Sequence, residues 1–305
     1  MKPALLVTGA DLAEQALALL QDFEVIYAGK TPQPQDVVAL CGRHNPVATI
    51  VRYGQFNAAM MQAAPALKVI SKHGSGTDTI DKQAAQARGI TVVAASGANA
   101  SAVAEQAAAM MLACAKSVVH LNARMHGGHW DKATHKSLEL AGLTVGLIGL
   151  GAIGQRFARI CAAMDMRVIG FDPFAIDVAN VQLASIEQIW QESDVISLHC
   201  PLTDDNFQLI NAKTLSQCKR GVILINTARG GLVHEATLLQ AIQSQQVSMA
   251  ALDSFAQEPF TAPHPFQGES RILLSPHIGG VSSAAYVNMG VAAAQNVLRI
   301  LKGSS

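Results

Sequence analysis

The sequence predicts an α/β protein built from two parallel-sheet domains, and three observations support this prediction. Short β-type runs alternate with helical patterns along residues 1–96 and again along residues 143–274, which is the element order of parallel sheets covered by helices. An apolar run at residues 143–148 leads into a glycine-rich turn and then a helical pattern, as in dinucleotide-binding folds. The composition is 50% apolar and only 14% charged, which suits compact domains and argues against disorder.

The charge balance and the cysteine content exclude several classes of protein. The 305 residues include 22 basic and 22 acidic side chains, so the chain has no electrostatic preference for nucleic acid or an anionic membrane. The five cysteines are odd in number and never spaced as C-x-x-C, which argues against a disulfide framework and a zinc site. The apolar start at residues 1–7 is too short for a secretory signal, and Glu105 and Gln106 interrupt the most apolar segment. We therefore expect a cytoplasmic protein that binds no metal, nucleic acid or membrane.

The first series of elements predicts a parallel sheet that does not bind a nucleotide. Its first strand is followed only by Thr8-Gly9-Ala10, which is too short for a phosphate-binding turn. The expected strands are residues 4–7, 25–27, 49–51, 67–70 and 91–93, and the expected helices are residues 12–20, 36–41, 58–63 and 82–87.

The second series is preceded by one long helical pattern at residues 101–124. Asn99 and Ser101 are its candidate caps, and the pattern alone fits a core helix, a hinge or a subunit contact. A final helical pattern at residues 284–301 follows the last strand and need not belong to the same domain. The expected strands of the second series are residues 143–148, 167–171, 195–198, 222–225, 247–252 and 272–274.

A dinucleotide-binding fingerprint follows the first strand of the second series. In Gly149-x-Gly151-x-x-Gly154, the first glycine permits a tight turn, the second lets a pyrophosphate approach the backbone, and the third lets the helix pack closely. The N-terminus of that helix then faces the phosphates. The next strand ends at Asp172, 18 positions after Gly154, where a carboxylate binds the ribose hydroxyls and favours NAD over NADP. The sequence therefore predicts NAD as the cofactor.

Polar side chains follow the last three strands of the second series. Arg229 follows the first of these strands, Asp253 and Glu258 follow the second, and His277 follows the third. Each of them alone is more often structural or solvated, but the carboxyl ends of parallel strands meet at one edge of a sheet. Together they predict a hydride-transfer site, in which His277 exchanges a proton with a substrate hydroxyl and Glu258 orients its imidazole. Arg229 would bind a carboxylate through its planar guanidinium.

These motifs resemble the D-isomer-specific 2-hydroxyacid dehydrogenase family over nearly the full chain. The resemblance implies a discontinuous flavodoxin-like substrate-binding domain at residues 1–98 and 284–305, and an inserted NAD-binding Rossmann domain at residues 99–283. It also implies a cleft that closes about hinges near residues 99 and 283, and a homodimer formed through the cofactor domain. The motifs that carry it are Gly149-Leu150-Gly151-Ala152-Ile153-Gly154, Asp172-Pro173, His199-Cys200-Pro201-Leu202-Thr203, Asn226-Thr227-Ala228-Arg229-Gly230-Gly231, Asp253, Glu258-Pro259 and Pro276-His277-Ile278-Gly279-Gly280.

The resemblance also implies roles for individual residues. Arg229, Glu258 and His277 would be the catalytic three, and Asp253 would hold the nicotinamide carboxamide. The implied cofactor contacts are Gly149, Gly151, Ala152, Ile153, Gly154, Asp172, Cys200, Pro201, Thr227, Ala228, Arg229, Asp253, His277, Gly279 and Gly280. Residues 72–81 are similar to the family's R-x-G-x-G-x-D-N-I-D loop, whose amides near Ser75 and Gly76 would bind the substrate carboxylate.

The substrate is predicted from the cations of the first domain. Arg52 follows a strand there, and with Lys72 it is similar to the 3-phosphoglycerate dehydrogenase branch of the family; Lys132 is a further candidate cation. Such a set suits a substrate phosphate, so Arg52, Ser75, Gly76, Arg229 and His277 are the predicted substrate contacts. The expected substrate pair is D-3-phosphoglycerate and 3-phosphohydroxypyruvate, as in serine biosynthesis, without a regulatory domain because the chain ends at Ser305. Solvated surface cations are the alternative, and they would leave hydroxypyruvate, glyoxylate or a branched 2-oxo acid open.

A protein of another class could use the same scaffold. The family also includes transcriptional corepressors that sense a dinucleotide, and such proteins can keep the three catalytic residues. The sequence shows no extra terminal segments and no obvious peptide-binding surface, which favours the enzyme. A methyltransferase that binds S-adenosylmethionine at a similar glycine loop would leave the downstream Arg, Glu and His unexplained.

Overall fold

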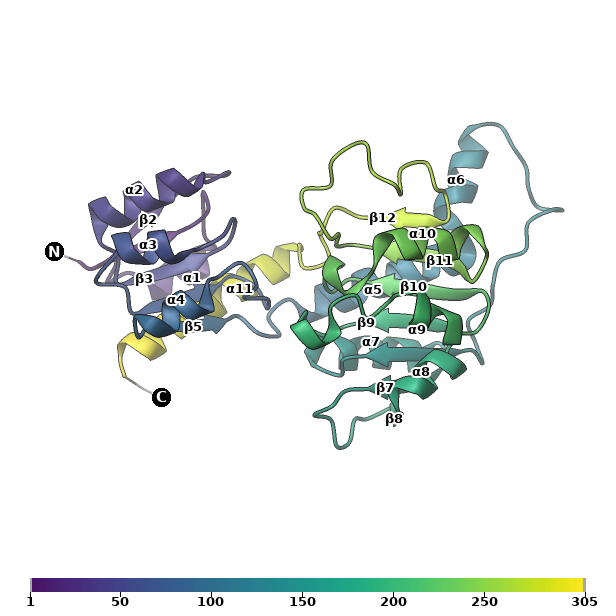
Figure 1. Cartoon of the computed structure of the whole chain (residues 1–305). Coiled ribbons are helices and arrows are strands. Elements are labelled where there is room, and N and C mark those ends of the chain that lie inside the picture. Colours follow the sequence, from purple (N-terminus) through teal and green to yellow (C-terminus); the bar gives the residue numbers. More distant parts are fainter. Residues whose placement is uncertain (1, 304–305) are drawn as a thin grey trace. The chain divides into compact units, whose positions relative to one another are not determined.

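The computed structural model describes residues 2–303, which form two compact α/β units (Figure 1). Unit 1 consists of Met1–Asn99 and Gly280–Ser305, and unit 2 consists of Ala100–Gly279. Each unit contains one parallel sheet covered by helices on both faces. The predicted α/β fold class with two parallel sheets is therefore confirmed.

Unit 1 is built on a five-stranded parallel sheet in the order β2-β1-β3-β4-β5, which is the flavodoxin-like order. The strands are β1 (Ala4–Val7), β2 (Glu24–Tyr27), β3 (Ala48–Val51), β4 (Val69–Lys72) and β5 (Thr91–Ala94). The helices are α1 (Glu14–Leu19), α2 (Pro34–His44), α3 (Ala58–Ala63), α4 (Lys82–Ala87) and α11 (Ser283–Leu301).

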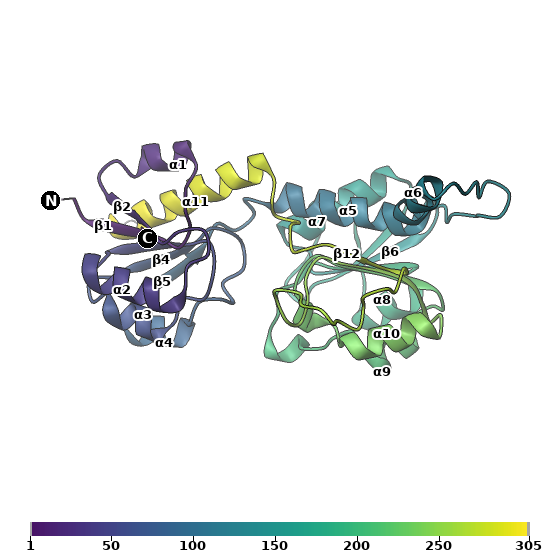
Figure 2. The same cartoon turned by 90° about the horizontal axis from the view of Figure 1, so that it is seen from above.

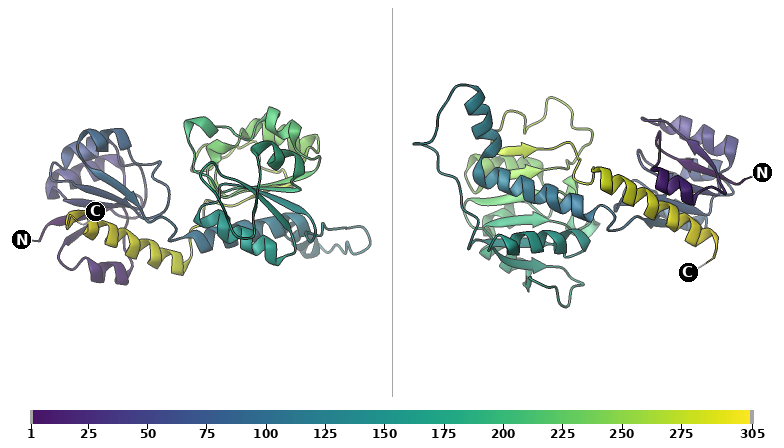
Figure 3. Two further views of the ribbon diagram at one scale, coloured as in Figure 1. Left: turned by 90° about the horizontal axis from the view of Figure 1, so that it is seen from below. Right: turned by 180° about the vertical axis from the view of Figure 1, so that it is seen from behind.

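The two faces of this sheet are covered by different helices, because successive side chains of a strand point to opposite sides. Leu5 and Val7 of β1 belong to one buried cluster with Ala16 of α1 and Val297 of α11. Leu6 belongs to the opposite cluster, which includes side chains of α2, α3 and α4. Figures 2 and 3 show α1 and α11 together on one face of the sheet. The core of unit 1 therefore needs chain segments from both ends of the sequence.

Unit 2 is built on a seven-stranded parallel sheet in the order β12-β11-β10-β9-β6-β7-β8. The strands are β6 (Thr144–Ile148), β7 (Arg167–Phe171), β8 (Gln182–Leu183), β9 (Val195–Leu198), β10 (Val222–Asn226), β11 (Val247–Leu252) and β12 (Ile272–Leu274). The helices are α5 (Ala100–Lys116), α6 (Val118–His126), α7 (Ala152–Ala163), α8 (Ile186–Glu192), α9 (Ala212–Gln217) and α10 (Glu235–Gln243), with short 3₁₀ turns η1 (Asp204–Asn206) and η2 (Gly230–Leu232).

The sheet of unit 2 is also covered on both faces. Helices α5 and α7 share one buried cluster with the sheet, to which Met111 and Phe157 contribute. Helices α8, α9 and α10 lie on the opposite face and contribute Trp190, Leu215 and Leu238 to a second cluster (Figure 2). The order of β7, β6 and β9 places the start of α7 at the point where the direction of winding reverses, which is where such sheets bind ligands.

The prediction of one helix over residues 101–124 is wrong. Ser117 has a left-handed backbone (φ 53°), which ends α5 and turns the chain into α6 at an angle of 61°. Nine residues of α5 are buried, so α5 is a core helix, whereas α6 buries none of its residues. Between residues 2 and 303 no single helix is long and apolar enough to cross a membrane, although α5 and α6 taken together reach that length and composition.

Candidate active site

The glycine turn between β6 and α7 has the geometry of a phosphate-binding loop. Gly149 has a φ of +96°, and a Cβ there would lie 2.6 Å from the amide nitrogen of Cys200. A Cβ at Gly154 would lie 2.1 Å from the carbonyl oxygen of Gly149. Gly151 differs from both, because its Cβ would meet nothing within 4 Å. The first and third glycines are thus required by packing, whereas the second leaves the backbone open to a ligand.

His199 and Cys200, the two residues that follow β9, pack against this glycine turn. His199 is half-buried as a residue, but its imidazole is enclosed: its Nε2 lies 3.0 Å from the hydroxyl of Ser197, and its ring lies 5.1 Å from that of Phe157 on α7. Burial lowers the pKa of His199 to about 4, so the imidazole stays neutral. Burial also raises the pKa of the Cys200 thiol to about 11. Neither side chain therefore carries a charge at neutral pH.

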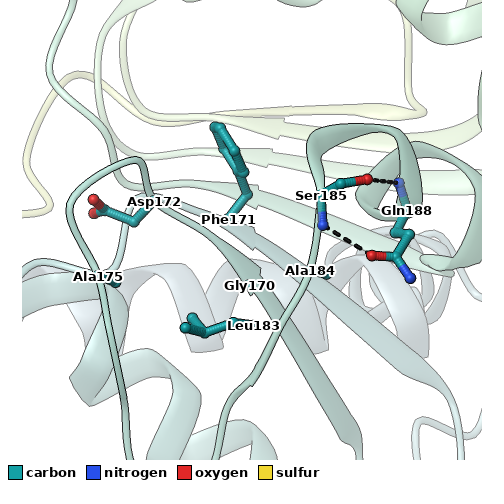
Figure 4. A pocket seen from close by; sticks show the side chains of 8 residues that line it. All are labelled: Gly170, Phe171, Asp172, Ala175, Leu183, Ala184, Ser185 and Gln188. Atoms are coloured by element: carbon teal, nitrogen blue, oxygen red, sulfur yellow. Dashed lines mark hydrogen bonds between the residues drawn. The ribbon is translucent and has the colours of Figure 1, made fainter.

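Asp172 lies at the carboxyl end of β7, where the fingerprint requires an acid. Its Oδ2 accepts a hydrogen bond of 2.8 Å from the Leu150 amide of the glycine turn, and its Oδ1 accepts one of 2.9 Å from the Phe174 amide. A cavity of about 320 Å³ begins beside it (Figure 4). Its lining residues are Gly170, Phe171, Asp172, Ala175, Leu183, Ala184, Ser185 and Gln188. The position and the partly apolar lining fit the adenosine end of a dinucleotide.

The backbone on both sides of Arg229, in the segment after β10, is fixed by hydrogen bonds to Asn226. Buried Asn226 donates to the Arg229 carbonyl over 2.9 Å and accepts from the Ala228 amide over 3.0 Å. Thr227 is only 9% exposed, and its hydroxyl has no hydrogen-bond partner within residues 2–303. Such a buried hydroxyl fits a predicted cofactor contact, because an unsatisfied polar group is costly without a partner.

Gly230 brings the Arg229 segment against the loop that follows β11. A Cβ at Gly230 would lie 1.9 Å from the carbonyl carbon of Phe255. The Phe255 amide in turn donates to Oε1 of Glu258 over 3.0 Å. The two loops that carry Arg229 and Glu258 are therefore in direct backbone contact.

His277 and Glu258 form the pair that the sequence predicts. His277 Nδ1 donates to Oε2 of Glu258 over 2.7 Å. His277 has a left-handed backbone (φ 54°), and the side chains of His277 and Glu258 are 46% and 37% exposed. With Nδ1 carrying the proton that Glu258 accepts, Nε2 is the imidazole atom available to exchange a proton with a ligand.

Asp253 fixes the backbone on which His277 lies. It is 1% exposed at the end of β11, and its two carboxylate oxygens accept from the Ile278 amide over 3.0 Å and from the Gly279 amide over 2.7 Å. A Cβ at Gly279 would lie 2.8 Å from the same carboxylate. The implied contact of Asp253 with a nicotinamide carboxamide stays a prediction, but its role in holding the His277 loop is visible in these bonds.

A further clamp, which the sequence did not indicate, holds the loop that carries Glu258. His264 Nδ1 accepts from the Phe266 amide over 3.3 Å, so its Nε2 carries the proton that faces Glu235 Oε2 at 3.5 Å. The other oxygen of Glu235 accepts from the Ala256 amide over 2.9 Å. The His264 ring packs 4.0 Å from the ring of Phe260. Glu235 and His264 thus tie both ends of this loop to α10.

The predicted substrate contacts of unit 1 lie at the carboxyl edge of its own sheet. Ser75 donates through its hydroxyl to Oδ1 of Asn99 over 2.8 Å, in the loop that follows β4. Lys72, which precedes this loop, donates to the Arg52 carbonyl over 3.2 Å. The Arg52 side chain is only 9% exposed and forms an ion pair with Asp11. Lys132, the third candidate cation, is exposed in the loop after α6 of unit 2.

The fold and these residues define a dinucleotide-binding scaffold with a His–Glu pair at the carboxyl edge of its cofactor-type sheet. The chain belongs to the D-isomer specific 2-hydroxyacid dehydrogenase family. Residues 108–279, more than half of the chain, match the NAD-binding domain of that family. The class of cofactor is therefore a nicotinamide dinucleotide, NAD or NADP.

Two relatives show how the similarity extends beyond that domain. The chain is 37% identical over 251 residues to a D-3-phosphoglycerate dehydrogenase of Archaeoglobus fulgidus, covering 81% of this chain and 48% of the relative. It is 36% identical over 247 residues to a hydroxypyruvate reductase of Thermotoga maritima, covering 80% of this chain and 81% of the relative. The chain thus spans about half the length of the phosphoglycerate dehydrogenases that it matches.

Solved structures show the same fold. The TT0316 protein from Thermus thermophilus superposes with a TM-score of 0.90 at 32% identity, covering 98% of this chain and 97% of the other. An acyclic imino acid reductase in complex with NADPH and D-Arg superposes with a TM-score of 0.88 at 25% identity, covering 98% and 97%. The second structure holds NADPH, which carries the extra 2′-phosphate. The fold alone therefore does not decide between NAD and NADP as the cofactor.

Proposed function

We propose that this chain is an NAD-dependent D-2-hydroxyacid dehydrogenase that transfers a hydride between the nicotinamide and a small 2-oxo or 2-hydroxy acid. The observation that carries the proposal is the 2.7 Å bond from His277 Nδ1 to Glu258, at the carboxyl edge of the sheet that bears the dinucleotide fingerprint. General acid–base catalysis requires an imidazole oriented in this way, whereas dinucleotide binding alone does not.

The residues divide the chemistry as follows. Glu258 keeps the proton on Nδ1 of His277, so that Nε2 removes the hydroxyl proton during oxidation and returns a proton to the developing alkoxide during reduction. Arg229 binds the substrate carboxylate through its guanidinium. The backbone amides at Ser75 and Gly76 are the substrate contacts proposed for unit 1. When bound, the nicotinamide supplies or accepts the hydride.

We infer the substrate from the surroundings of Arg52. The sequence-based expectation is 3-phosphohydroxypyruvate, supported by Arg52 and Lys72 and by the similarity to phosphoglycerate dehydrogenases. The ion pair of Arg52 with Asp11 instead favours an unphosphorylated 2-oxo acid such as hydroxypyruvate or glyoxylate, because the guanidinium already has an anionic partner. We propose the unphosphorylated acid as the better substrate.

The test of the function is a screen of NADH oxidation at 340 nm with 3-phosphohydroxypyruvate, hydroxypyruvate, glyoxylate and a branched 2-oxo acid. Turnover of at least one acid, lost in the His277→Ala variant, supports the proposal. Absence of turnover with every acid would contradict it. If the protein then still bound NADH, a dinucleotide-sensing protein would be the better description.

Asp172 is expected to set the preference for NAD. Its carboxylate lies at the end of β7, the position from which an acid contacts the ribose hydroxyls in dinucleotide-binding folds and would repel the 2′-phosphate of NADP. Replacement by alanine should lower the ratio of kcat/KM for NADH to that for NADPH about tenfold or more. Asp177, exposed in the same loop, is the matched control, and Asp177→Ala should leave this ratio unchanged. A wild-type preference for NADPH would refute the role given to Asp172.

We also propose that the chain forms a homodimer through unit 2. The support is the surface of α6, which buries no residue and exposes Val118, Val119 and Met125. Such apolar exposure is typical of a surface that is covered by a partner. Light scattering after size exclusion should give the mass of two chains, and Val119→Glu should shift it toward one.

A further inference from the structure

Two tyrosines of unit 1 face the guanidinium of one arginine, and the third tyrosine of the chain is in electrostatic range of the same group. The Arg52 guanidinium carbon lies 5.1 Å from the ring centre of Tyr53 and 5.0 Å from that of Tyr286, a distance at which a cation and an aromatic face attract each other. The Tyr27 hydroxyl is near enough to Asp11 for the negative charge to help raise its pKa, after the larger effect of burial. With Tyr27, Tyr53 and Tyr286 every tyrosine of the sequence is accounted for.

Asp11 completes this cluster by pairing with the arginine. Arg52 Nη1 donates both to Oδ1 and to the backbone carbonyl of Asp11. The Tyr286 hydroxyl donates to the same Oδ1 over 2.9 Å. The Arg52 side chain is 9% exposed, whereas that of Asp11 is 65% exposed. The surface that the pair presents to solvent is therefore the carboxylate and not the guanidinium.

The position of the cluster follows from the order of the sheet. Arg52 directly follows β3, and Asp11 lies in the loop after its neighbour β1. The Arg52 amide donates to the Thr8 hydroxyl over 3.0 Å, which fixes the end of β3 against the end of β1. A Cβ at Gly9 would lie 3.0 Å from Cδ of Arg52. The absence of a side chain at Gly9 thus lets Arg52 reach across to Asp11.

The cluster adjoins the loop that is proposed to bind the substrate carboxylate. Lys72 donates to the Arg52 carbonyl over 3.2 Å and to the Thr79 hydroxyl over 3.5 Å, and so connects the cluster to both sides of residues 73–76. His73, the first residue of that loop, packs its ring 5.8 Å from the Tyr286 ring. A substrate held at Ser75 and Gly76 would therefore have the cluster beside its remaining atoms.

The charge of Asp11 persists at neutral pH. Hydrogen bonds from Arg52 and Tyr286 lower the pKa of this carboxyl below its usual value, so it is ionised wherever a 2-oxo acid would be reduced. A phosphate near Arg52 would have to displace this carboxylate and would meet a like charge that is largely exposed. An uncharged hydroxyl group would meet neither cost, and the tyrosine hydroxyls and the carboxylate could hydrogen-bond to it.

We propose that Asp11 is a specificity-determining residue that occupies Arg52 and excludes phosphorylated 2-oxo acids in favour of unphosphorylated ones. This inference rests on the proposed function, because it concerns the substrate of that reaction. The Asp11 carboxylate would repel a substrate phosphate, in addition to the contacts that attract the substrate carboxylate. Specificity commonly requires both attraction of one ligand and repulsion of another. Asp11 acts on the distal end of the substrate and takes no part in hydride or proton transfer.

The test is the ratio of kcat/KM for 3-phosphohydroxypyruvate to kcat/KM for the better of hydroxypyruvate and glyoxylate. Asp11→Asn removes the charge and should raise this ratio about tenfold or more. Tyr286→Phe removes one hydrogen bond to Asp11 and should raise it by a smaller factor. In the double variant Asp11→Asn/Arg52→Ala the ratio should return to about its wild-type value, because the guanidinium that would bind the phosphate has been removed. Asp22→Asn, at an exposed acid of the same unit, should leave the ratio at its wild-type value.

The outcomes separate the inference from the function on which it rests. If the wild-type protein turns over neither class of acid, the proposed function fails. If it reduces an unphosphorylated acid but the ratio stays within about twofold of wild type in Asp11→Asn and Tyr286→Phe, only the role of Asp11 is overturned. A wild-type preference for the phosphorylated acid would overturn that role as well. Should Asp11→Asn prove unfolded by circular dichroism, the ratio in Tyr286→Phe decides alone.

Discussion

Replacing His277 by alanine is expected to lower kcat about 10²- to 10⁴-fold, which is the usual contribution of a positioned acid–base group. The side chain is 46% exposed, so its removal leaves no cavity, and the thermal midpoint of unfolding should stay at the wild-type value. Steady-state NADH oxidation with the best 2-oxo acid measures the first quantity, and circular dichroism measures the second. His129→Ala, at an exposed histidine of the same unit, is the matched control and should keep full activity.

The partner variant Glu258→Gln tests the orientation that the structure gives to this imidazole. The amide keeps the size of the side chain but removes the charge that faces His277 Nδ1 at 2.7 Å. The loss in kcat should be smaller than for His277→Ala, and the double variant should lose little more than His277→Ala alone, because the two residues act as one unit. More than a tenth of wild-type kcat in His277→Ala would contradict the acid–base role.

Replacing Gly230 by alanine is expected to destabilise unit 2 more than any surface change. Its Cβ would lie 1.9 Å from the carbonyl carbon of Phe255, a backbone atom that cannot rotate away. We expect a loss of about 3 kcal/mol or more in the free energy of unfolding, which corresponds to a fall of about 6–12 °C in Tm for a unit of this size. To accommodate the added methyl group, the loops that carry Arg229 and Glu258 would have to move apart. We therefore expect kcat to fall also in the fraction of the protein that remains folded.

A second glycine provides the control for this effect. At Gly151 an added Cβ meets nothing within 4 Å, so Gly151→Ala should change the free energy of unfolding by no more than about 0.5 kcal/mol. It should nevertheless raise the Kd for NADH, measured by fluorescence titration, because the methyl group occupies the space through which a pyrophosphate approaches the turn. Equal Tm values for Gly230→Ala and Gly151→Ala would refute the close contact at Phe255.

The sequence predicted the elements whose patterns are strong and local. Strands such as Thr144–Ile148 and Val222–Asn226 are buried on both faces and read as continuous apolar runs, so their existence follows directly from composition. The break at Ser117 was not predicted, because no glycine or proline marks it and the helical periodicity continues on both sides. Strand β8 was missed because it has only two residues, both exposed, and carries no apolar pattern.

In the candidate site, too, the sequence predicted the residues that local patterns mark and missed the contacts between residues that are distant in sequence. Arg229, Glu258 and His277 were found because they follow strands whose ends meet in a parallel sheet. Residues that act through distant partners gave no such signal. Asp11 and Tyr286 are 275 positions apart and meet only because α11 packs beside α1, and the contact of His264 with Glu235 likewise depends on how a long loop folds back onto α10. These contacts could not be predicted from the sequence, because they depend on the tertiary fold.

The contribution of α11 to unit 1 has a consequence for synthesis of the chain. Residues 1–99 leave the ribosome long before Ser283–Leu301, yet Leu5, Val7 and Ile50 share their buried cluster with Ala293, Ala294 and Val297. Until α11 arrives, that face of the nascent sheet is exposed to water and to other chains, whereas unit 2 is continuous and can fold as soon as its own residues have emerged. A chain cut short before Ser283 should therefore contain a folded unit 2 and an aggregation-prone unit 1, so the segment made first completes its fold last.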